Sequence, residues 1–124
     1  MLVLLVNLWL REGAAVAGFE AFERTAQELM APFGGRVERC WRPAQTSGEA
    51  AVPFEVQLVS FPGRAELAAY LADAGVQARA AQRDQLIAKT VVWEAPAADY
   101  LDIGGAATTS ASVRIATTAA NPDP

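Results

Sequence analysis

The sequence predicts an α+β domain in which an antiparallel sheet carries both of its helices on one face. The first observation is the run Leu2–Leu10, which is apolar on both faces of a period-two pattern, as a central strand covered on both sides would be. The second is a helical repeat of apolar residues in 14–33 and again in 64–89. The third is the resulting order: strand, helix, strand, strand, helix, strand.

The two faces of the first strand differ in chemistry. One face carries only aliphatic side chains, namely Leu2, Leu4, Val6, Leu8 and Leu10. On the other face Asn7 and Trp9 follow Val3 and Leu5, so an amide and an indole interrupt it. We therefore expect the first face to be plain core and the second to be the wall of a pocket.

The helix predicted over 14–33 has an apolar stripe at spacings of three and four, formed by Phe19, Phe22, Ala26, Leu29, Met30 and Phe33. Pro32 and the pair Gly34-Gly35 should end it, because proline cannot continue a helix and glycine readily adopts the conformation of a helix C-cap.

Two strands follow, at 36–42 and 54–61, separated by an aperiodic loop over 44–52. Alternation in the first strand puts Val37, Arg39 and Trp41 on one face. Alternation in the second strand groups Glu55, Gln57, Val59 and Phe61. Pro62-Gly63 should end this second strand.

A helical region over 64–89 should bend near 73–75, and a last strand is predicted at 90–94. Its expected buried stripe is Leu67, Tyr70, Leu71, Val76, Ala80 and Ile87. From residue 96 the chain is rich in Ala, Thr, Ser and Pro, which offer little apolar area to offset the entropy of ordering. We predict one domain at 1–95 and a mostly flexible tail at 96–124, with an added edge strand at 112–116 as an alternative.

The composition excludes several classes of function. The net charge is −4 with scattered Lys and Arg, which argues against a nucleic-acid partner. Histidine is absent, which removes His-activated nucleophiles, imidazole zinc sites and the usual haem ligand. No group of Asp and Glu has the spacing of metal ligands either. We therefore expect no metal and no cofactor. The apolar N-terminal run is shorter than the ~20 residues of a membrane span and lacks signal-peptide flanks, so we expect a cytoplasmic protein and no membrane partner.

The predicted element order is the ferredoxin-like βαββαβ arrangement, whose right-handed crossovers place both helices on the same face of the sheet. The opposite face should then carry Val3, Leu5, Trp9, Val59 and Phe61, with Trp41 and Trp93 as further candidates. No third helix is predicted that would cover so apolar a face. We therefore expect a homodimer in which two open sheet faces pack around a shared interior.

The segment 54–90 also has a recognisable pattern, carried by Phe61-Pro62, Asp73, Val76-Gln77, Arg83, Ile87-Ala88 and Thr90. With the element order, this pattern resembles the dimeric α+β barrel superfamily and, within it, the uncharacterised DUF1330-type proteins. The resemblance implies a dimeric barrel over about residues 1 to 95. It does not imply one function, because the superfamily includes monooxygenases, isomerases, haem-degrading enzymes and chlorite dismutases.

The candidate substrate-binding residues are those expected to face the shared interior: Asn7, Trp9, Arg39, Trp41, Glu55, Gln57 and Trp93. The resemblance implies that cofactor-free monooxygenases of the superfamily hold a phenolic substrate with interior Asn, Trp and Arg side chains. In that role Asn7 would stabilise an oxyanion, and Trp9 or Trp41 would stack on an aromatic ring. The alternative is that Asn7 bonds a neighbouring strand or a buried water and that the tryptophans are dimer core.

The charged candidates also have two interpretations each. Glu55 is either a general base in a partly apolar cavity or a rim residue paired with Arg39 or Arg64. Arg39 either holds an anionic substrate group or is solvated at the surface. Arg79, Arg83 and Asp84 are expected either on a solvated helix face or in a local ion pair.

Three functions remain open at this point. The protein either binds a small aromatic metabolite without turning it over, or is a cofactor-independent monooxygenase, isomerase or cyclase acting on an aromatic or polyketide-like compound. In the third case the barrel interior is filled with side chains, and the protein acts through its surface or its tail.

Overall fold

The computed structural model describes residues 1–98 and 100. Its elements are β1 (Leu2–Leu10), α1 (Val16–Met30), the 3-10 turn η1 (Ala31–Phe33), β2 (Arg36–Trp41), β3 (Glu55–Phe61), α2 (Arg64–Ala72), α3 (Ala74–Gln77), α4 (Ala80–Leu86) and β4 (Ile87–Glu94). The predicted order of strands and helices is confirmed. The predicted edge strand at 112–116 and the rest of the predicted tail beyond residue 100 lie outside the described residues.

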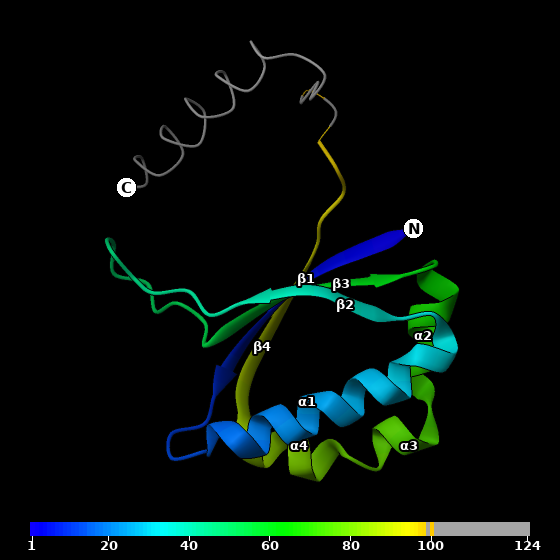
Figure 1. The fold of residues 1–124 in the computed structure, drawn as a ribbon, viewed down its shortest axis with the longest axis horizontal. Coiled ribbons are helices and arrows are strands. Elements are labelled where there is room, and N and C mark those ends of the chain that lie inside the picture. The colour runs from blue at the N-terminus through cyan, green and yellow to red at the C-terminus, as the bar shows by residue number, and fades with distance from the viewer. Residues whose placement is uncertain (99, 101–124) are drawn as a thin grey trace. The chain divides into compact units, whose positions relative to one another are not determined.

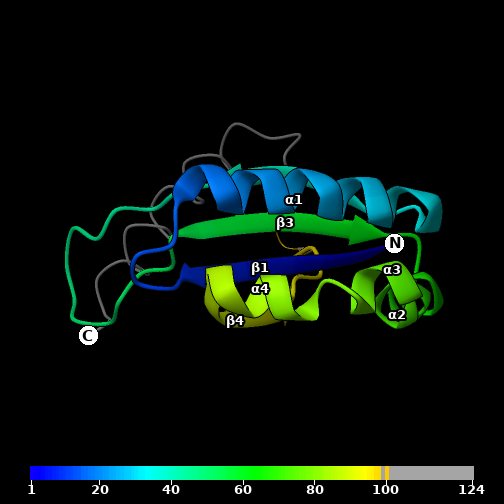
Figure 2. The same ribbon diagram turned by 90° about the horizontal axis from the view of Figure 1, so that it is seen from below.

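Four strands form one antiparallel sheet in the order β2-β3-β1-β4. β1 is central, as its two apolar faces predict, and it pairs with β3 on one side and β4 on the other. Figure 1 shows that α1, α3 and α4 lie on the same side of the sheet. Seen from that side, α1 and the row α2, α3 and α4 run next to each other along the direction of the strands (Figure 2). The ferredoxin-like arrangement, with its helices on one face, is therefore confirmed.

The core lies between the helices and the sheet, in two clusters of buried side chains. One is formed by Leu2, Leu4, Met30, Val59 and Phe61, and the other by Leu8, Phe19, Phe22 and Ile87. The register explains this grouping, because Leu2 pairs with Phe61 and Leu4 pairs with Val59. Residues paired across an antiparallel ladder point to the same face of the sheet.

The helix ends are set by local chemistry. α1 ends in the turn η1, which contains Pro32, and Gly34 then adopts a left-handed conformation with a φ of 77°. The predicted bend near residue 73 is a true break: Asp73 is extended, and its carboxylate accepts a hydrogen bond from the Val76 amide at 3.1 Å, capping α3. The last strand begins at Ile87, earlier than predicted.

The edge strand β2 does not alternate as predicted. A bulge between Val37 and Arg39 shifts the register, so that Val37 pairs with Val59 while Arg39 pairs with Leu58. An extra residue at a bulge reverses the alternation. Val37 therefore faces the helices, whereas Arg39 and Trp41 face the opposite side, together with Arg36.

None of the helices in the described part of the chain has the length and apolar character that a membrane span requires. In the loop after β2, the Gln45 side-chain amide donates to the Gly48 carbonyl at 2.6 Å.

Candidate functional site

A cavity of about 570 Å³ lies on the helix side of the sheet. Its floor is formed by the helix-facing residues of three strands: Leu4, Val6, Leu8, Gln57, Val59, Phe61, Thr90 and Val92. Its walls come from α1, from α2, and from α3 and α4 with the turn that joins them. Such a volume lies within the range of about 300–1,000 Å³ that small-molecule sites occupy.

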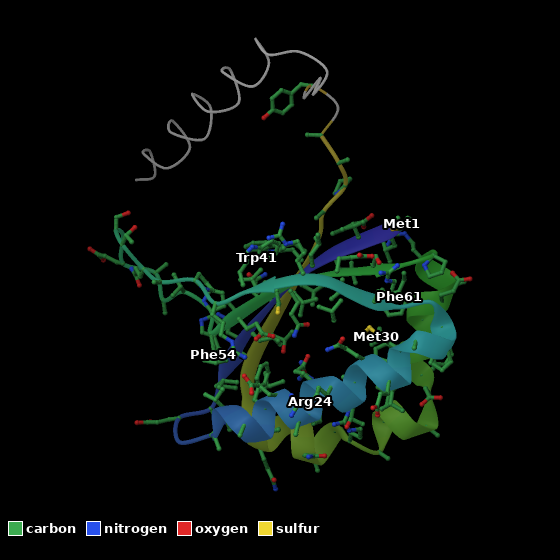
Figure 3. All side chains as sticks on the ribbon, in the orientation of Figure 1. Met1, Arg24, Met30, Trp41, Phe54 and Phe61 are labelled. Carbon is green, nitrogen blue, oxygen red and sulfur yellow. The ribbon has the colours of Figure 1, made fainter. Side chains whose placement is uncertain are left out.

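One end of the cavity is apolar. Here Phe61 and Met30 lie between the sheet and the helices, as Figure 3 shows, and both are buried. The Tyr70 ring packs against Phe61, with ring centroids 5.6 Å apart. Burial of this side chain raises the pKa of the Tyr70 phenol above its ordinary value. The phenol is therefore neutral near neutral pH and can serve as a hydrogen-bond donor.

The other end of the cavity is polar and is organised by Gln57, which pairs with Val6 in the sheet. The Gln57 Nε2 amide donates to Glu23 Oε1 at 2.8 Å and to Glu55 Oε2 at 2.8 Å. Glu55 also accepts from Arg42 Nε at 3.0 Å, and Arg42 Nη2 lies 3.0 Å from Glu20 Oε2. One amide therefore bridges a cavity carboxyl group and an ion-paired one.

Glu23 is the ionisable acid that faces the cavity. Burial raises the pKa of its carboxyl group above the ordinary value of 4.5, and the negative charge of nearby Glu55 acts in the same direction. The hydrogen bond from Gln57 and the positive charges of Arg83 and Arg79 oppose this shift. A carboxyl group with a raised pKa is suited to exchange a proton with a bound molecule.

Two arginines four residues apart lie beside this acid. Arg79 Nη2 donates to the Phe22 carbonyl at 2.9 Å, and its guanidinium lies over the Phe22 ring, 3.8 Å from the centroid. Arg83 donates to the hydroxyl of Thr90 on β4. Both side chains line the cavity. The expectation of a solvated helix face is therefore wrong for these two arginines, whereas Asp84 is exposed.

The predicted site residues divide between the two faces of the sheet. The register places Asn7, Trp9, Arg39, Trp41 and Trp93 together on the open face, away from the cavity. Figure 3 shows Trp41 on the side of the sheet opposite α1. Trp41 and Trp93 are 42% and 58% exposed. Two of the three indole rings have a cation over them: Lys89 Nζ lies 4.8 Å from the centroid of Trp9, and the Arg39 guanidinium lies 5.3 Å from the centroid of Trp41.

Asn7 is engaged within its own sheet. Its Nδ2 donates to the Val91 carbonyl on the neighbouring strand β4 at 3.1 Å, and the side chain is buried. Asn7 therefore bonds a neighbouring strand, which is one of the interpretations given above for this residue. Its amide donor is therefore partly used before any ligand arrives.

Glu55 and Gln57 do not share a face with Asn7. The register pairs Glu55 with Leu8 and Gln57 with Val6, so both side chains point toward the helices. Glu55 is also not paired with Arg39 or Arg64, because its partner is Arg42. The same parity corrects the expected open face, because Val59 and Phe61 belong to the helix-side core.

Sequence reasoning missed Glu23, Tyr70, Arg79, Arg83 and Thr90 as cavity residues. A signal existed for Glu23, which stands three residues before Ala26 and seven before Met30, within the apolar stripe of α1. The spacing of Arg79 and Arg83 likewise puts both on one face of a helix. Whether the two arginine side chains face the sheet or the solvent depends on how α3 and α4 pack on the sheet, and a local sequence pattern does not predict that packing.

Within residues 1–98 and 100, no group of three His, Cys, Asp or Glu side chains is arranged to hold a metal ion. The side chains that converge on the cavity can instead bind by hydrogen bonds, by charge and by apolar contact.

No protein family model matches the chain, and no curated protein matches it in sequence. Solved structures do match. A protein of unknown function from Rhodopseudomonas palustris superimposes with a TM-score of 0.67 at 14% identity, over 79% of this chain and 82% of that one. A Dabb family protein with a ferredoxin-like fold from Mesorhizobium loti has a TM-score of 0.56 at 15% identity, over 79% and 97%.

A third solved structure, described as an antibiotic biosynthesis monooxygenase, has a TM-score of 0.56 at 13% identity, over 80% of this chain and 100% of that one. At these identities the similarity concerns the fold alone. The chain has a ferredoxin-like α+β fold, and its function has to be argued from its own site.

Proposed function

We propose that this protein binds a small, largely apolar molecule in the cavity between α1, α2, α4 and the sheet. The observation that carries the proposal is the cavity itself, about 570 Å³ in volume, with apolar side chains at one end and Glu23, Gln57, Arg79 and Arg83 at the other. A mostly apolar pocket with a few convergent polar groups is the common form of a small-molecule site.

A blocking substitution tests this proposal. Ala26 lines the cavity from α1, whereas Ala21 is exposed on the same helix and outside the cavity. Ala26→Trp should fill part of the cavity and abolish binding of a neutral fluorescent probe, N-phenyl-1-naphthylamine. Ala21→Trp is the matched control and should bind as the wild type does. If both variants and the wild type give the same fluorescence titration, or the wild type does not bind, the proposal is wrong.

A second candidate function is cofactor-independent catalysis, as a monooxygenase, an isomerase or a cyclase, on an aromatic or polyketide-like compound. The observation that favours it is Glu23, an acid with a raised pKa facing an apolar cavity. The test follows oxygen uptake and product formation with phenolic and hydroquinone compounds. Wild type should exceed the background rate, and Glu23→Gln should return to it. A wild-type rate at the background would leave binding without turnover as the function for these compounds, and an unchanged rate above it in Glu23→Gln would exclude Glu23 as the acid or base.

We also propose that a second copy of this chain covers the open sheet face. In support, this face carries two exposed indole side chains, Trp41 and Trp93, next to the apolar residues Leu5, Leu58 and Val91. An apolar patch of this kind on a protein surface commonly marks an interface with a partner. Two such faces of the same shape can pack on each other around a two-fold axis. The fold similarity to dimeric α+β barrels agrees with this arrangement, and membership of the DUF1330-type proteins is kept as a hypothesis based on segment 54–90.

Sedimentation tests the homodimer. The wild type should sediment as a dimer at micromolar concentration, and Trp93→Glu should weaken the association, because it places a charge in the proposed apolar interface. Val16→Glu is the control, since Val16 is 40% exposed at the start of α1, away from the sheet face. A wild-type monomer at these concentrations would contradict the proposal.

A further inference from the structure

We infer that the ligand of this cavity is an organic acid in its carboxylate form with a flat or extended apolar body, and that Arg79 and Arg83 bind the carboxylate. This inference rests on the proposed binding function and adds the chemical class of the ligand and its orientation. Three features of the cavity support it: the gradient of polarity along the strands, the unused donors of the two arginines, and the local balance of charge.

The polarity of the cavity changes in one direction along β1. At the level of Leu4, the paired residue is Val59, and the apolar cluster containing Met30 and Phe61 surrounds them. At the level of Val6 and Leu8, the paired residues are Gln57 and Thr90. A ligand that matches this gradient has one apolar end and one polar end.

The two guanidinium groups retain hydrogen-bonding capacity. Arg79 is held by the Phe22 carbonyl and ring, and Arg83 is held by the Thr90 hydroxyl. A guanidinium group has several N–H donors in a planar fork, so one such bond leaves others available. In the described part of the chain, neither side chain lies within ion-pair distance of a carboxylate. Both groups are thus held in place without a carboxylate at ion-pair distance among the described residues.

The nearby acids do not neutralise these charges. Glu55 is ion-paired with Arg42, and Glu23 shares the Gln57 amide with it. Glu23 is the single carboxylic acid among the residues that line the cavity, against the two arginines, so the polar end carries more positive than negative charge even when Glu23 is ionised. A carboxylate is a planar group that a guanidinium can bind with two parallel hydrogen bonds. An anionic head at this end would leave its apolar body at the end containing Phe61 and Tyr70.

A series of naphthalene compounds with one body and different charges tests this inference. 2-Naphthoate is the anion, 2-naphthamide is the neutral analogue and 2-naphthylmethylammonium is the cation. Binding is measured by calorimetry at about pH 7, where the carboxylic acid is ionised. We expect 2-naphthoate to bind about tenfold more tightly than the amide, as charge-assisted hydrogen bonds predict, and the cation to bind most weakly.

Substitution of the arginines locates the effect. Arg83→Gln and Arg79→Gln should each lower the affinity for 2-naphthoate about tenfold and change that for 2-naphthamide less than about twofold. Retained amide binding shows that a variant is folded and its cavity is intact. Arg24→Gln is the matched control, because Arg24 is exposed on α1 and does not line the cavity.

The possible results separate this inference from the binding function it rests on. Suppose that 2-naphthamide binds as tightly as 2-naphthoate and that Ala26→Trp abolishes its binding. The cavity then binds small molecules, but the inferred ligand class is wrong. If the arginine variants lose anion and amide affinity equally, the arginines only support the fold and the inference is again wrong. If no compound of the series binds and N-phenyl-1-naphthylamine does not bind either, the binding function itself fails.

Discussion

Gly35 gives the sharpest test of how the cavity end near Phe61 is packed. Gly35 is buried and has no left-handed backbone angle, so alanine is allowed there by the backbone. A β-carbon at this position would lie 2.5 Å from Phe61 Cε1, 2.7 Å from Phe61 Cζ and 3.0 Å from Met30 Cβ. Ordinary contact begins at 3.4 Å, so the ring has to move by about 0.9 Å, the difference between 3.4 and 2.5 Å.

The cost of Gly35→Ala follows from where the Phe61 ring can go. Overpacking a core typically costs about 1–3 kcal/mol. The cavity borders Phe61, so the ring has room to shift, and a glycine-to-alanine change also lowers the entropy of the unfolded chain. We therefore expect the free energy of unfolding to fall by about 1–2 kcal/mol, or about 4–16 °C in Tm for a domain of this size.

Urea denaturation followed by circular dichroism measures this effect, and Gly18→Ala is the control. Gly18 lies inside α1, where an added β-carbon would meet only Leu86 Cδ2, at 3.7 Å. Alanine there should stabilise the protein by about 0.5–1 kcal/mol, because glycine disfavours a helix interior.

A double-mutant cycle links the Gly35 effect to the ring. In a Phe61→Leu background, Gly35→Ala should cost about 1 kcal/mol less than in the wild type, because the ring that it contacts is gone. The reasoning is refuted if Gly35→Ala is neutral while Gly18→Ala stabilises, or if the Phe61→Leu background leaves its cost unchanged.

Three further predictions concern single side chains. The folded-state pKa of Glu23 is raised above 4.5, so the wild type has its full stability below pH 4.5 and loses part of it as the pH rises through the raised pKa. Glu23→Gln should therefore match the wild type in acid and become the more stable protein at higher pH. Parallel pH profiles of the free energy of unfolding would contradict this. Asp73→Ala should lower the free energy of unfolding by about 1 kcal/mol through loss of the α3 cap, whereas Asp73→Asn should keep most of it; equal losses would exclude a capping role. Phe19→Ala should cost about 3–5 kcal/mol in urea denaturation, since Phe19 is 1% exposed and packs edge-on against Phe54 at 5.7 Å; a loss below about 1 kcal/mol would show that this cluster is not core.

The order and type of the elements were predictable because they follow from local patterns. The two-sided apolar run Leu2–Leu10 required a central strand, and the stripe from Phe19 to Met30 required a helix against a sheet. The break near Asp73 was visible as a short polar and glycine-containing interruption. Each of these signals lies within a few residues along the chain.

The location of the candidate site was not predictable in the same way. The alternation within β3 correctly grouped Glu55 with Gln57, Val59 and Phe61, but the period alone does not say which face meets the helices. The pairing of β1 with β3 decides this, and it turns that group toward α1. The bulge in β2 similarly reversed the expected relation between Val37 and Arg39.

The sequence by itself determined a ferredoxin-like α+β chain organised around a central strand that is apolar on both faces. Only the tertiary structure decided that the cavity lies on the helix side, with Glu23, Arg79 and Arg83 at its polar end. The physical reason is that the periodicity of apolar residues reports only the local backbone geometry of residues close together in the chain. The facing of a strand and the direction of an arginine instead depend on register and docking between residues far apart in sequence.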